Sequence, residues 1–164
     1  MNDYILIGKI VNTHGIKGEL RILSDFEYKE KVFKVGTLIY IGKNKDEKNI
    51  TSYRHHKVFE MITIDNINDI NTVFKYKGEL VYIKKEILEL KSDEYLLSDL
   101  IGCEIIEKDK NYGQVEEIVK NNTQILLFVV GKKNFYIPKV KKYINKVDIV
   151  NKKIYTNEIE ELLL

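Results

Sequence analysis

The sequence contains one cysteine, one proline, no tryptophan and no alanine among its 164 residues. One cysteine excludes an internal disulfide, and three histidines beside it leave few ligands for a zinc site. The longest uncharged apolar run has six residues, Ile125 to Val130, whereas a membrane-spanning helix needs roughly 20. The start, Met1-Asn2-Asp3, lacks the basic region of a secretory signal. These absences predict a soluble, cytoplasmic protein without a membrane segment.

The sequence also has no large excess of positive or negative charge, because its 27 basic side chains are nearly balanced by 25 acidic ones. This balance excludes a general polycation and leaves room only for local charged surfaces. Isoleucine, with 24 residues, and tyrosine, with 11, are abundant and occur in short runs. β-Branched and aromatic residues in short runs are typical of strands. We therefore predict a mostly β chain with one domain or two small ones.

The first 90 residues are predicted to form a small β-barrel. A turn is expected at residues 12–18 and a polar loop at 43–49. Asn68 is placed to cap a short helix over 69–77, with Gly78 as the residue that ends it. Strands are expected at residues 4–11, 19–23, 37–41, 50–56, 58–64 and 80–83.

The polar stretch at residues 91–94 is the predicted linker to a second small β-barrel over 95–164. The connection at 108–112 and the one at Asn121-Asn122 have hairpin lengths, and asparagine tolerates the positive φ of a two-residue turn. A terminal helix is expected at 158–163. Strands are expected at residues 101–107, 113–119, 124–130, 134–137, 147–150 and 153–156.

The most distinctive segment is His14-Gly15-Ile16-Lys17-Gly18-Glu19. Its two glycines free the backbone to approach another molecule, and Lys17 between them offers a cation. A G-x-x-G loop clamps a nucleic-acid backbone in KH modules, where the loop joins two helices; here strands flank it. The alternative is a tight turn that needs positive φ at the glycines. The residues alone leave both interpretations open.

A lysine stripe follows in the second half of the chain, with one acid, Asp148, inside it. Tyr136 and Tyr143 are interleaved with the lysines, and aromatic rings can stack on exposed bases. The stripe therefore favours an anionic partner such as RNA, while the alternative is a solvated strand edge protected by lysines. The stripe consists of Lys132, Lys133, Lys139, Lys141, Lys142, Lys146, Lys152 and Lys153.

No motif for catalysis or metal binding is visible. Cys103 alternates with Ile101 and Ile105 on the predicted inward face of a strand, where a lone thiol is a small apolar group. His55 and His56 are neighbours, and neighbours in a strand point to opposite faces, so the two are poorly placed to share a metal. The chain has no P-loop, nucleophile elbow or dinucleotide fingerprint. We predict a protein that is not an enzyme and has no cofactor.

Several segments form a distinctive ordered set along the chain. They are Ile7-Gly8-Lys9-Ile10, His14 to Glu19, Ser24-Asp25-Phe26, Tyr95 to Gly102, Gly113-Gln114-Val115, Ile137-Pro138, Val140 and Val147-Asp148. Taken together, they resemble the RimM family of bacterial ribosome maturation factors. The match extends from about Tyr4 to Ile154, and the ordered set is more specific than any single motif.

The resemblance implies an N-terminal barrel similar to the second domains of translation elongation factors and a C-terminal PRC-type barrel. It implies a non-enzymatic assembly factor that binds the immature small ribosomal subunit. Such a factor assists maturation of the subunit head and 16S rRNA processing, and contacts small-subunit ribosomal protein nineteen. We expect a monomer. The alternative is a PRC-barrel adaptor that docks a different protein or a membrane complex.

The resemblance and the lysine stripe together assign two groups of contact residues. The family's second aromatic is replaced by leucine at position 96. For the subunit and its rRNA we predict contacts by His14, Gly15, Lys17, Gly18, Glu19, Lys139, Lys141 and Lys142. For the protein partner we predict contacts by Tyr95, Leu96, Asp99, Leu100, Ile101 and Gly102.

Overall fold

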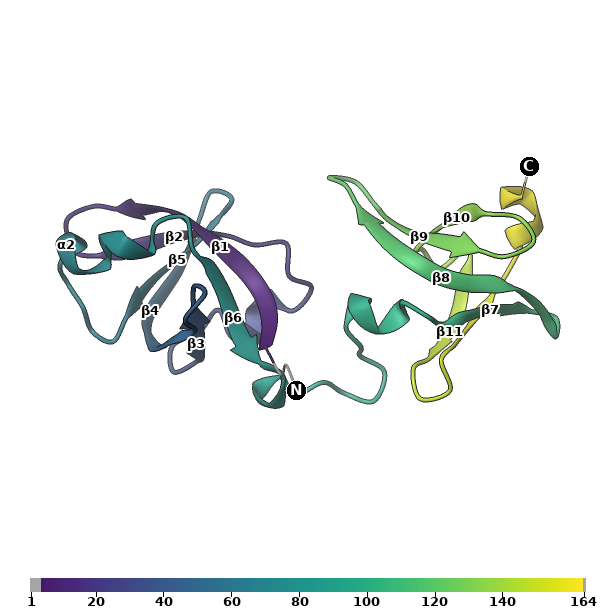
Figure 1. The fold of residues 1–164 in the computed structure, drawn as a ribbon, viewed down its shortest axis with the longest axis horizontal. Coiled ribbons are helices and arrows are strands. Elements are labelled where there is room, and N and C mark those ends of the chain that lie inside the picture. Colours follow the sequence, from purple (N-terminus) through teal and green to yellow (C-terminus); the bar gives the residue numbers. More distant parts are fainter. Residues whose placement is uncertain (1–3, 164) are drawn as a thin grey trace. The chain divides into compact units, whose positions relative to one another are not determined.

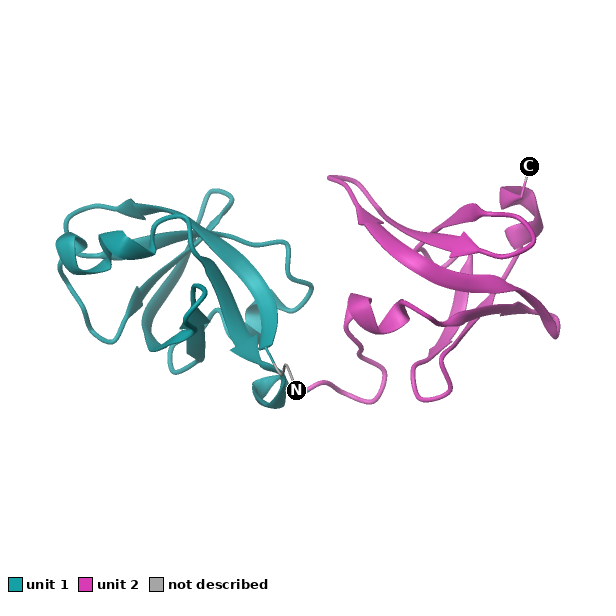
Figure 2. Ribbon diagram, viewed as in Figure 1, with its two compact units in different colours: residues 1–89 teal, residues 90–164 magenta. Residues whose placement is uncertain are grey.

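The computed structural model describes residues 4–163. The chain divides into two compact units, an N-terminal unit of residues 1–89 and a C-terminal unit of residues 90–164 (Figure 2). Strands dominate both units (Figure 1), which confirms the prediction of a mostly β fold. Within residues 4–163, no helix has both the length and the apolar character required to cross a membrane.

The N-terminal unit is a closed barrel in which the strands follow the order β1-β2-β5-β4-β3-β6 and neighbouring strands are antiparallel (Figure 1). Its strands are β1 Tyr4–His14, β2 Glu19–Leu23, β3 Leu38–Ile41, β4 Asp46–His56, β5 Phe59–Ile64 and β6 Leu80–Lys84. Its short helices are α1 Lys29–Val32, α2 Ile70–Val73 and the 3-10 helices η1 Phe74–Tyr76 and η2 Lys85–Ile87.

Alternation along β2 shows how the barrel sorts its side chains. Leu20 and Ile22 are fully buried, and Arg21 between them is only partly buried, as the two-residue period of a strand requires. Arg21 pairs with Met61 on β5, and Met61 pairs in turn with Arg54 on β4. The register therefore places the two arginines on either side of one residue of the central strand.

Three local predictions for this unit are wrong. The predicted loop at 43–49 is mostly strand, because β4 begins at Asp46, which pairs with Ile41 after a short turn. β1 continues to His14, so the turn is shorter than 12–18. The helix is capped by Asp69, whose carboxylate accepts the Asn71 N–H at 3.1 Å, and not by Asn68.

The C-terminal unit is a six-stranded sheet in the order β10-β9-β8-β7-β12-β11, with β12 and β7 parallel and the other pairs antiparallel. Its buried core includes Leu100, Cys103, Ile105, Leu127 and Ile154. Its strands are β7 Glu104–Glu107, β8 Lys110–Lys120, β9 Ile125–Val130, β10 Phe135–Pro138, β11 Ile144–Asp148 and β12 Lys153–Thr156, and its 3-10 helices are η3 Leu97–Leu100 and η4 Ile159–Leu162.

The sequence misplaced several boundaries in this unit. The strand predicted at 101–107 begins only at Glu104, because η3 turns the chain before it. The connection at 108–112 is a turn of two residues, Lys108 and Asp109, both with positive φ. Asn121 and Asn122 do not have positive φ; instead the Asn121 side-chain oxygen accepts the Thr123 and Gln124 N–H groups. β11 starts at Ile144 rather than at 147, and residues 158–163 hold a short 3-10 helix.

Candidate functional site

The loop of residues 15–18 closes the β1–β2 hairpin. Gly15 and Gly18 have φ of +69° and +83°, so the expected need for positive φ is confirmed. The side chain of Ile16 is 81% exposed, and Lys17 is also exposed. The carbonyl of Ile16 accepts the Ile70 N–H at 3.2 Å, which ties the loop to α2. The loop thus presents an apolar side chain and a cation on a fixed backbone.

Beside this loop the barrel brings together both arginines of the chain and two of its three histidines, His14 and His56, on β1, β2 and β4. The guanidinium of Arg21 lies 2.6 Å from Nδ1 of His14. Because a guanidinium can only donate, Nδ1 of His14 accepts and carries no proton in this arrangement. The same guanidinium carbon lies 5.1 Å from the centre of the Phe59 ring, and the Arg21 Nε is buried without a partner.

Arg54 holds Glu19 by a two-point ion pair, with Nε and Nη2 donating to the carboxylate at 2.9 and 2.8 Å. This hydrogen bonding lowers the pKa of Glu19. His55, on the same strand, lies 2.9 Å from the buried Glu60 carboxylate, which also accepts the Tyr53 hydroxyl. The carboxylate of Glu19 is therefore oriented by Arg54 and is not free to bind a partner.

His56 lies among basic side chains, and Arg54, Lys57 and Arg21 each disfavour its charged form. Its ring centre is 6.1 Å from that of His14. Burial lowers the pKa of His56, and repulsion from Arg54 and Lys57 lowers it further. Sequence reasoning missed Arg21, Arg54 and His56, because they become neighbours of the loop only through pairing across β2, β5 and β4.

Replacing Arg54 by glutamine is expected to raise the pKa of His56, because one of the cations that disfavours the imidazolium is removed. The pKa of Glu19 should rise toward 4.5 in the same variant, since its main hydrogen-bond donor is lost. NMR titration of the ring protons and of the carboxyl carbon measures both. Lys43→Gln, in the β3–β4 turn, is the control and should change neither. An unchanged His56 pKa in Arg54→Gln would contradict the assignment.

The sign of the resulting pH dependence follows from the direction of the shift. The folded-state pKa of His56 lies below 6.5, its ordinary value. The unfolded chain therefore takes up this proton first as the pH falls. The contribution of His56 to stability is complete above pH 6.5 and declines below it, and this decline should be smaller in Arg54→Gln.

In the C-terminal unit the structure joins members of the two predicted contact groups. The ammonium of Lys139 lies 5.2 Å from the centre of the Tyr95 ring, a cation–π distance. Lys141 is exposed in the connection between β10 and β11. Lys142 instead forms an ion pair of 2.7 Å with Glu161, and this hydrogen bond raises the pKa of Lys142 to about 12. Tyr95, Lys139 and Lys141 are therefore better placed for a partner than Lys142.

The predicted protein-contact segment is partly core. Leu96 is 5% exposed and Leu100 is fully buried, so the prediction that these two side chains contact a partner is corrected. They are buried because the chain turns through η3, where the carboxylate of Asp99 accepts the Leu96 N–H at 3.1 Å. Ile101 is 45% exposed and follows this turn.

Gly102 has φ of +86° and lies beside the aliphatic stem of Lys152. The Lys152 ammonium donates to the carbonyls of Asp99 and Ile101 at 2.8 and 3.0 Å. Lys152 of the stripe therefore anchors the η3 segment instead of offering its charge to a partner. Tyr95 and Ile101 remain as the accessible apolar side chains of the segment.

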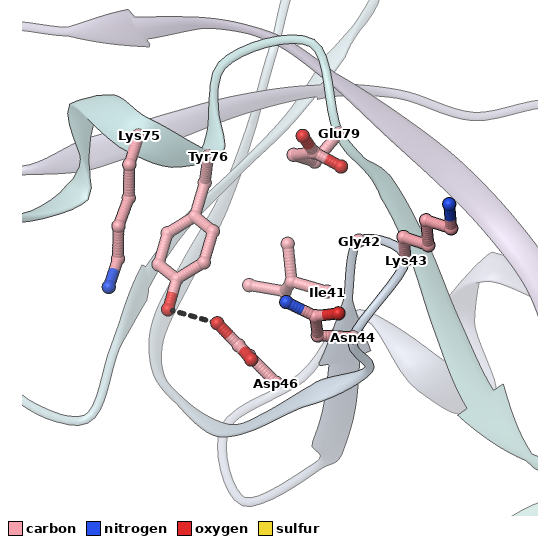
Figure 3. Close-up of a pocket in the computed structure, with 8 residues that line it drawn as sticks. All are labelled: Ile41, Gly42, Lys43, Asn44, Asp46, Lys75, Tyr76 and Glu79. Atoms are coloured by element: carbon pink, nitrogen blue, oxygen red, sulfur yellow. Dashed lines mark hydrogen bonds between the residues drawn. The ribbon is translucent and has the colours of Figure 1, made fainter.

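A small hollow of about 180 Å³ lies at the β3–β4 turn of the N-terminal barrel (Figure 3). The Tyr76 hydroxyl donates to Asp46 at 3.2 Å. Burial, together with the charge of the Asp46 carboxylate, raises the pKa of Tyr76 to about 12. Glu79 lies on the other side of the hollow, against Gly42. Within residues 4–163, no group of three or more histidine, cysteine, aspartate and glutamate side chains could hold a metal ion.

Cys103 lies just before β7 rather than within the strand, and it is fully buried in the core. Its Sγ donates to the Asp99 carbonyl at 3.5 Å, and burial raises the pKa of the thiol. A thiol with a raised pKa is a poor nucleophile. The interpretation of Cys103 as a small apolar core residue is confirmed.

The comparisons with known proteins match both units. Residues 5–88 match the family model of the RimM N-terminal domain, and residues 97–162 match that of the RimM PRC barrel domain. Ribosome maturation factor RimM of Staphylococcus haemolyticus is 36% identical over 162 residues, which cover 96% of this chain and 97% of that protein. The protein of the same name in Ligilactobacillus salivarius is 37% identical over 166 residues, covering 98% and 99%.

Among solved structures, the N-terminal domain of RimM from Thermus thermophilus aligns with 54% of this chain and 98% of that domain, with 15% identity and a TM-score of 0.47. The sequence relatives carry the assignment, because their identity exceeds 30% over nearly the whole of both proteins. With a matching family model on each unit, the chain belongs to the RimM family of ribosome maturation factors.

Proposed function

We propose that this protein is a non-enzymatic assembly factor that binds the immature small ribosomal subunit. In this role it assists 16S rRNA processing and maturation of the subunit head, and it contacts small-subunit ribosomal protein nineteen. The observation that carries the proposal is the membership of both units in the RimM family, whose relatives are named ribosome maturation factors. The geometry supports it through two accessible surfaces, one on each unit.

The N-terminal surface is suited to a nucleic-acid backbone. Lys17 and Ile16 project from a loop whose backbone is fixed by α2. The positive group around His56 adjoins this loop through His14, the residue before it, whose ring centre lies 6.1 Å from that of His56. Cations held on a rigid frame bind phosphates without first losing much conformational freedom. The loop would therefore contact rRNA through Lys17, with Glu19 kept away by Arg54.

The C-terminal surface is suited to a protein that itself lies on RNA. Tyr95 offers an aromatic ring beside Lys139, and Ile101 offers an exposed aliphatic side chain. Aromatic anchors surrounded by polar groups are typical of binding hot spots. We assign the contact with ribosomal protein nineteen to Tyr95 and Ile101, and the neighbouring rRNA contact to Lys139 and Lys141.

Such a factor acts by differential affinity. Binding more tightly to the partly folded head than to the finished one shifts the population toward the productive intermediate. Release follows when completion of the head covers or reshapes the site. No covalent step is required of the protein.

Co-sedimentation with purified immature and mature small subunits at two salt concentrations tests the proposal. We expect selective binding to the immature particle, weakened by salt because phosphate contacts release counterions. Lys141→Glu and Lys17→Glu should each reduce the slope of log affinity against log salt by about 1. Lys43→Glu makes the same charge change in the β3–β4 turn and should leave the slope unchanged.

Equal binding to both particles would overturn the proposal. If the affinity changes neither with salt nor with the substitutions at Lys17 and Lys141, the result would instead support an adaptor that recognises a different protein.

A further inference from the structure

A larger hollow lies in the C-terminal unit, and its lining includes none of the predicted contact residues. Its volume is about 650 Å³, within the range of pockets that hold small ligands. It forms where the start of β8, the β9–β10 turn and the C-terminal residues around η4 meet. Its lining residues are Lys110, Asn111, Tyr112, Gly113, Gly131, Lys132, Lys133, Phe135, Glu160 and Leu163.

One wall of this hollow is bare backbone. A Cβ on Gly131 would lie 2.2 Å from the Tyr112 carbonyl oxygen, and a Cβ on Gly113 would lie 2.3 Å from the Val130 carbonyl oxygen. The two strands can therefore approach only because both residues lack side chains. The close approach of the two strands at Gly113 and Gly131 leaves no side chain on this side of the hollow and fixes the shape of the hollow.

The other walls combine an aromatic ring with buried apolar surface. Phe135 is 5% exposed and forms part of the core below the hollow. The Tyr112 hydroxyl donates to Glu160 at 2.6 Å, which fixes the ring and raises the pKa of Tyr112 to about 12. The Lys110 ammonium lies 4.7 Å from the centre of this ring. Tyr112 is thus a neutral, oriented ring with a cation at its face.

The charges at the rim favour an anion. Lys132 and Lys133 are exposed, and neither forms a hydrogen bond or an ion pair with the part of the chain that the structure describes. With Lys110 they give the lining of the hollow three lysines against one carboxylate, Glu160, which already accepts the Tyr112 hydroxyl. The best-matched ligand has a flat apolar group that fits against the aromatic and apolar walls. It also carries negative charge that meets the lysines at the rim.

We propose that this hollow binds one unpaired nucleotide of single-stranded RNA, with the base beside Tyr112 and the adjacent phosphates on Lys132 and Lys133. The choice of RNA over another anion rests on the proposed function. The binding mode combines stacking on an aromatic side chain with phosphate contacts by flexible cations, as in sequence-tolerant single-strand binding. The site extends the RNA-binding surface beyond Lys139 and Lys141 to the β9–β10 turn.

Fluorescence anisotropy with a labelled ten-nucleotide single-stranded RNA, and with a duplex of the same sequence, tests this site in the full-length protein. We expect the single strand to bind more tightly than the duplex, because only an unpaired base can enter the hollow. The double variant Lys132→Gln/Lys133→Gln should reduce the salt slope by about 1.4, for two phosphate contacts on a single strand. Both lysines are exposed, so this variant tests the site without disturbing the fold.

Tyr112→Leu should weaken binding about tenfold, the order of one lost stacking interaction, whereas Tyr112→Phe keeps the ring and most of the affinity. Lys43→Gln/Lys75→Gln, in the N-terminal unit, is the matched control for charge and should bind like the unchanged protein.

Three outcomes would overturn the inference. These are equal affinity for the duplex, full affinity of the lysine double variant, and competition by an oligoglutamate peptide that abolishes RNA binding at charge-equivalent concentration. The last would show an acidic protein segment to be the preferred occupant. Co-sedimentation with immature subunits is measured separately. Subunit binding without single-strand binding would therefore reject this site alone, and loss of subunit binding with single-strand binding intact would reject only the proposed function.

Discussion

Replacing Gly131 by alanine is expected to lower the free energy of unfolding of the C-terminal unit by about 3 kcal/mol or more. The new Cβ would lie 2.2 Å from the Tyr112 carbonyl oxygen and 3.0 Å from the Gly113 Cα. Both obstacles are backbone atoms of β8, so no side-chain rotation can relieve the overlap. Relief requires the β9–β10 turn to move away from β8, which disturbs the pairing of β8 with β9.

Gly15→Ala provides the matched control. A Cβ on Gly15 meets nothing within 4 Å, but φ is +69°, so the cost is conformational alone, about 1 to 2 kcal/mol, and falls on the N-terminal unit. Urea unfolding followed by hydrogen exchange in each unit measures the two effects separately. Equal losses in the two variants, or a loss in the N-terminal unit for Gly131→Ala, would contradict the steric explanation.

Leu100→Ala is the second substitution with a large expected effect. Leu100 is fully buried among the core residues of the C-terminal unit, so truncation leaves a cavity and should cost about 2 to 5 kcal/mol of stability. The same measurement of unfolding in each unit applies. The loss should be confined to the C-terminal unit, because the barrel of residues 1–89 has its own core.

Ile101→Ala tests whether this neighbouring residue contributes to partner binding rather than to stability. Ile101 is 45% exposed, and an exposed truncation changes stability by about 0.5 kcal/mol or less, while binding to ribosomal protein nineteen should weaken in a pull-down with the purified proteins. The assignment would be reversed if Leu100→Ala, with its C-terminal unit still folded, bound more weakly while Ile101→Ala bound normally. Leu100 would then be the contact residue and Ile101 would not.

Much of the fold follows from local pattern. β2 and β12 occupy the predicted ranges, because alternation of polar and apolar residues in Glu19–Leu23 and the short β-branched run in Lys153–Thr156 are local features. The positive φ at Gly15 and Gly18 follows from the same local reading, since few residues other than glycine adopt it. Cys103 is buried as predicted, although Ile101, which was expected on the same inward face, is 45% exposed.

The errors arise where distant residues decide. Residues 46–49 read as a polar loop, but they form strand because β3 provides hydrogen-bond partners for their backbone. Lys45, Lys57 and Lys108 adopt positive φ in tight turns, although lysine carries no signal for that conformation. The sequence predicts Lys142 and Lys152 as cations available to a partner. In the structure Lys142 pairs with Glu161, and Lys152 donates to the carbonyls of Asp99 and Ile101, all of which lie in other segments of the chain.

The strand content, the loop of residues 15–18 and the family could be predicted from composition, periodicity and ordered motifs, because these are properties of the unfolded chain as much as of the folded one. Which of these residues can contact a partner depends on the folded chain. Pairing of β2 with β5 and of β5 with β4 brings Arg21, Arg54 and His56 together, and η3 turns Leu96 and Leu100 inward. The contact of β8 with the β9–β10 turn shaped the hollow at Tyr112. The first depends on pairing between strands that are not consecutive in sequence, the second on burial in the core, and the third on close packing of backbone against backbone. In such places the free energy of burial and hydrogen bonding overrides local preference.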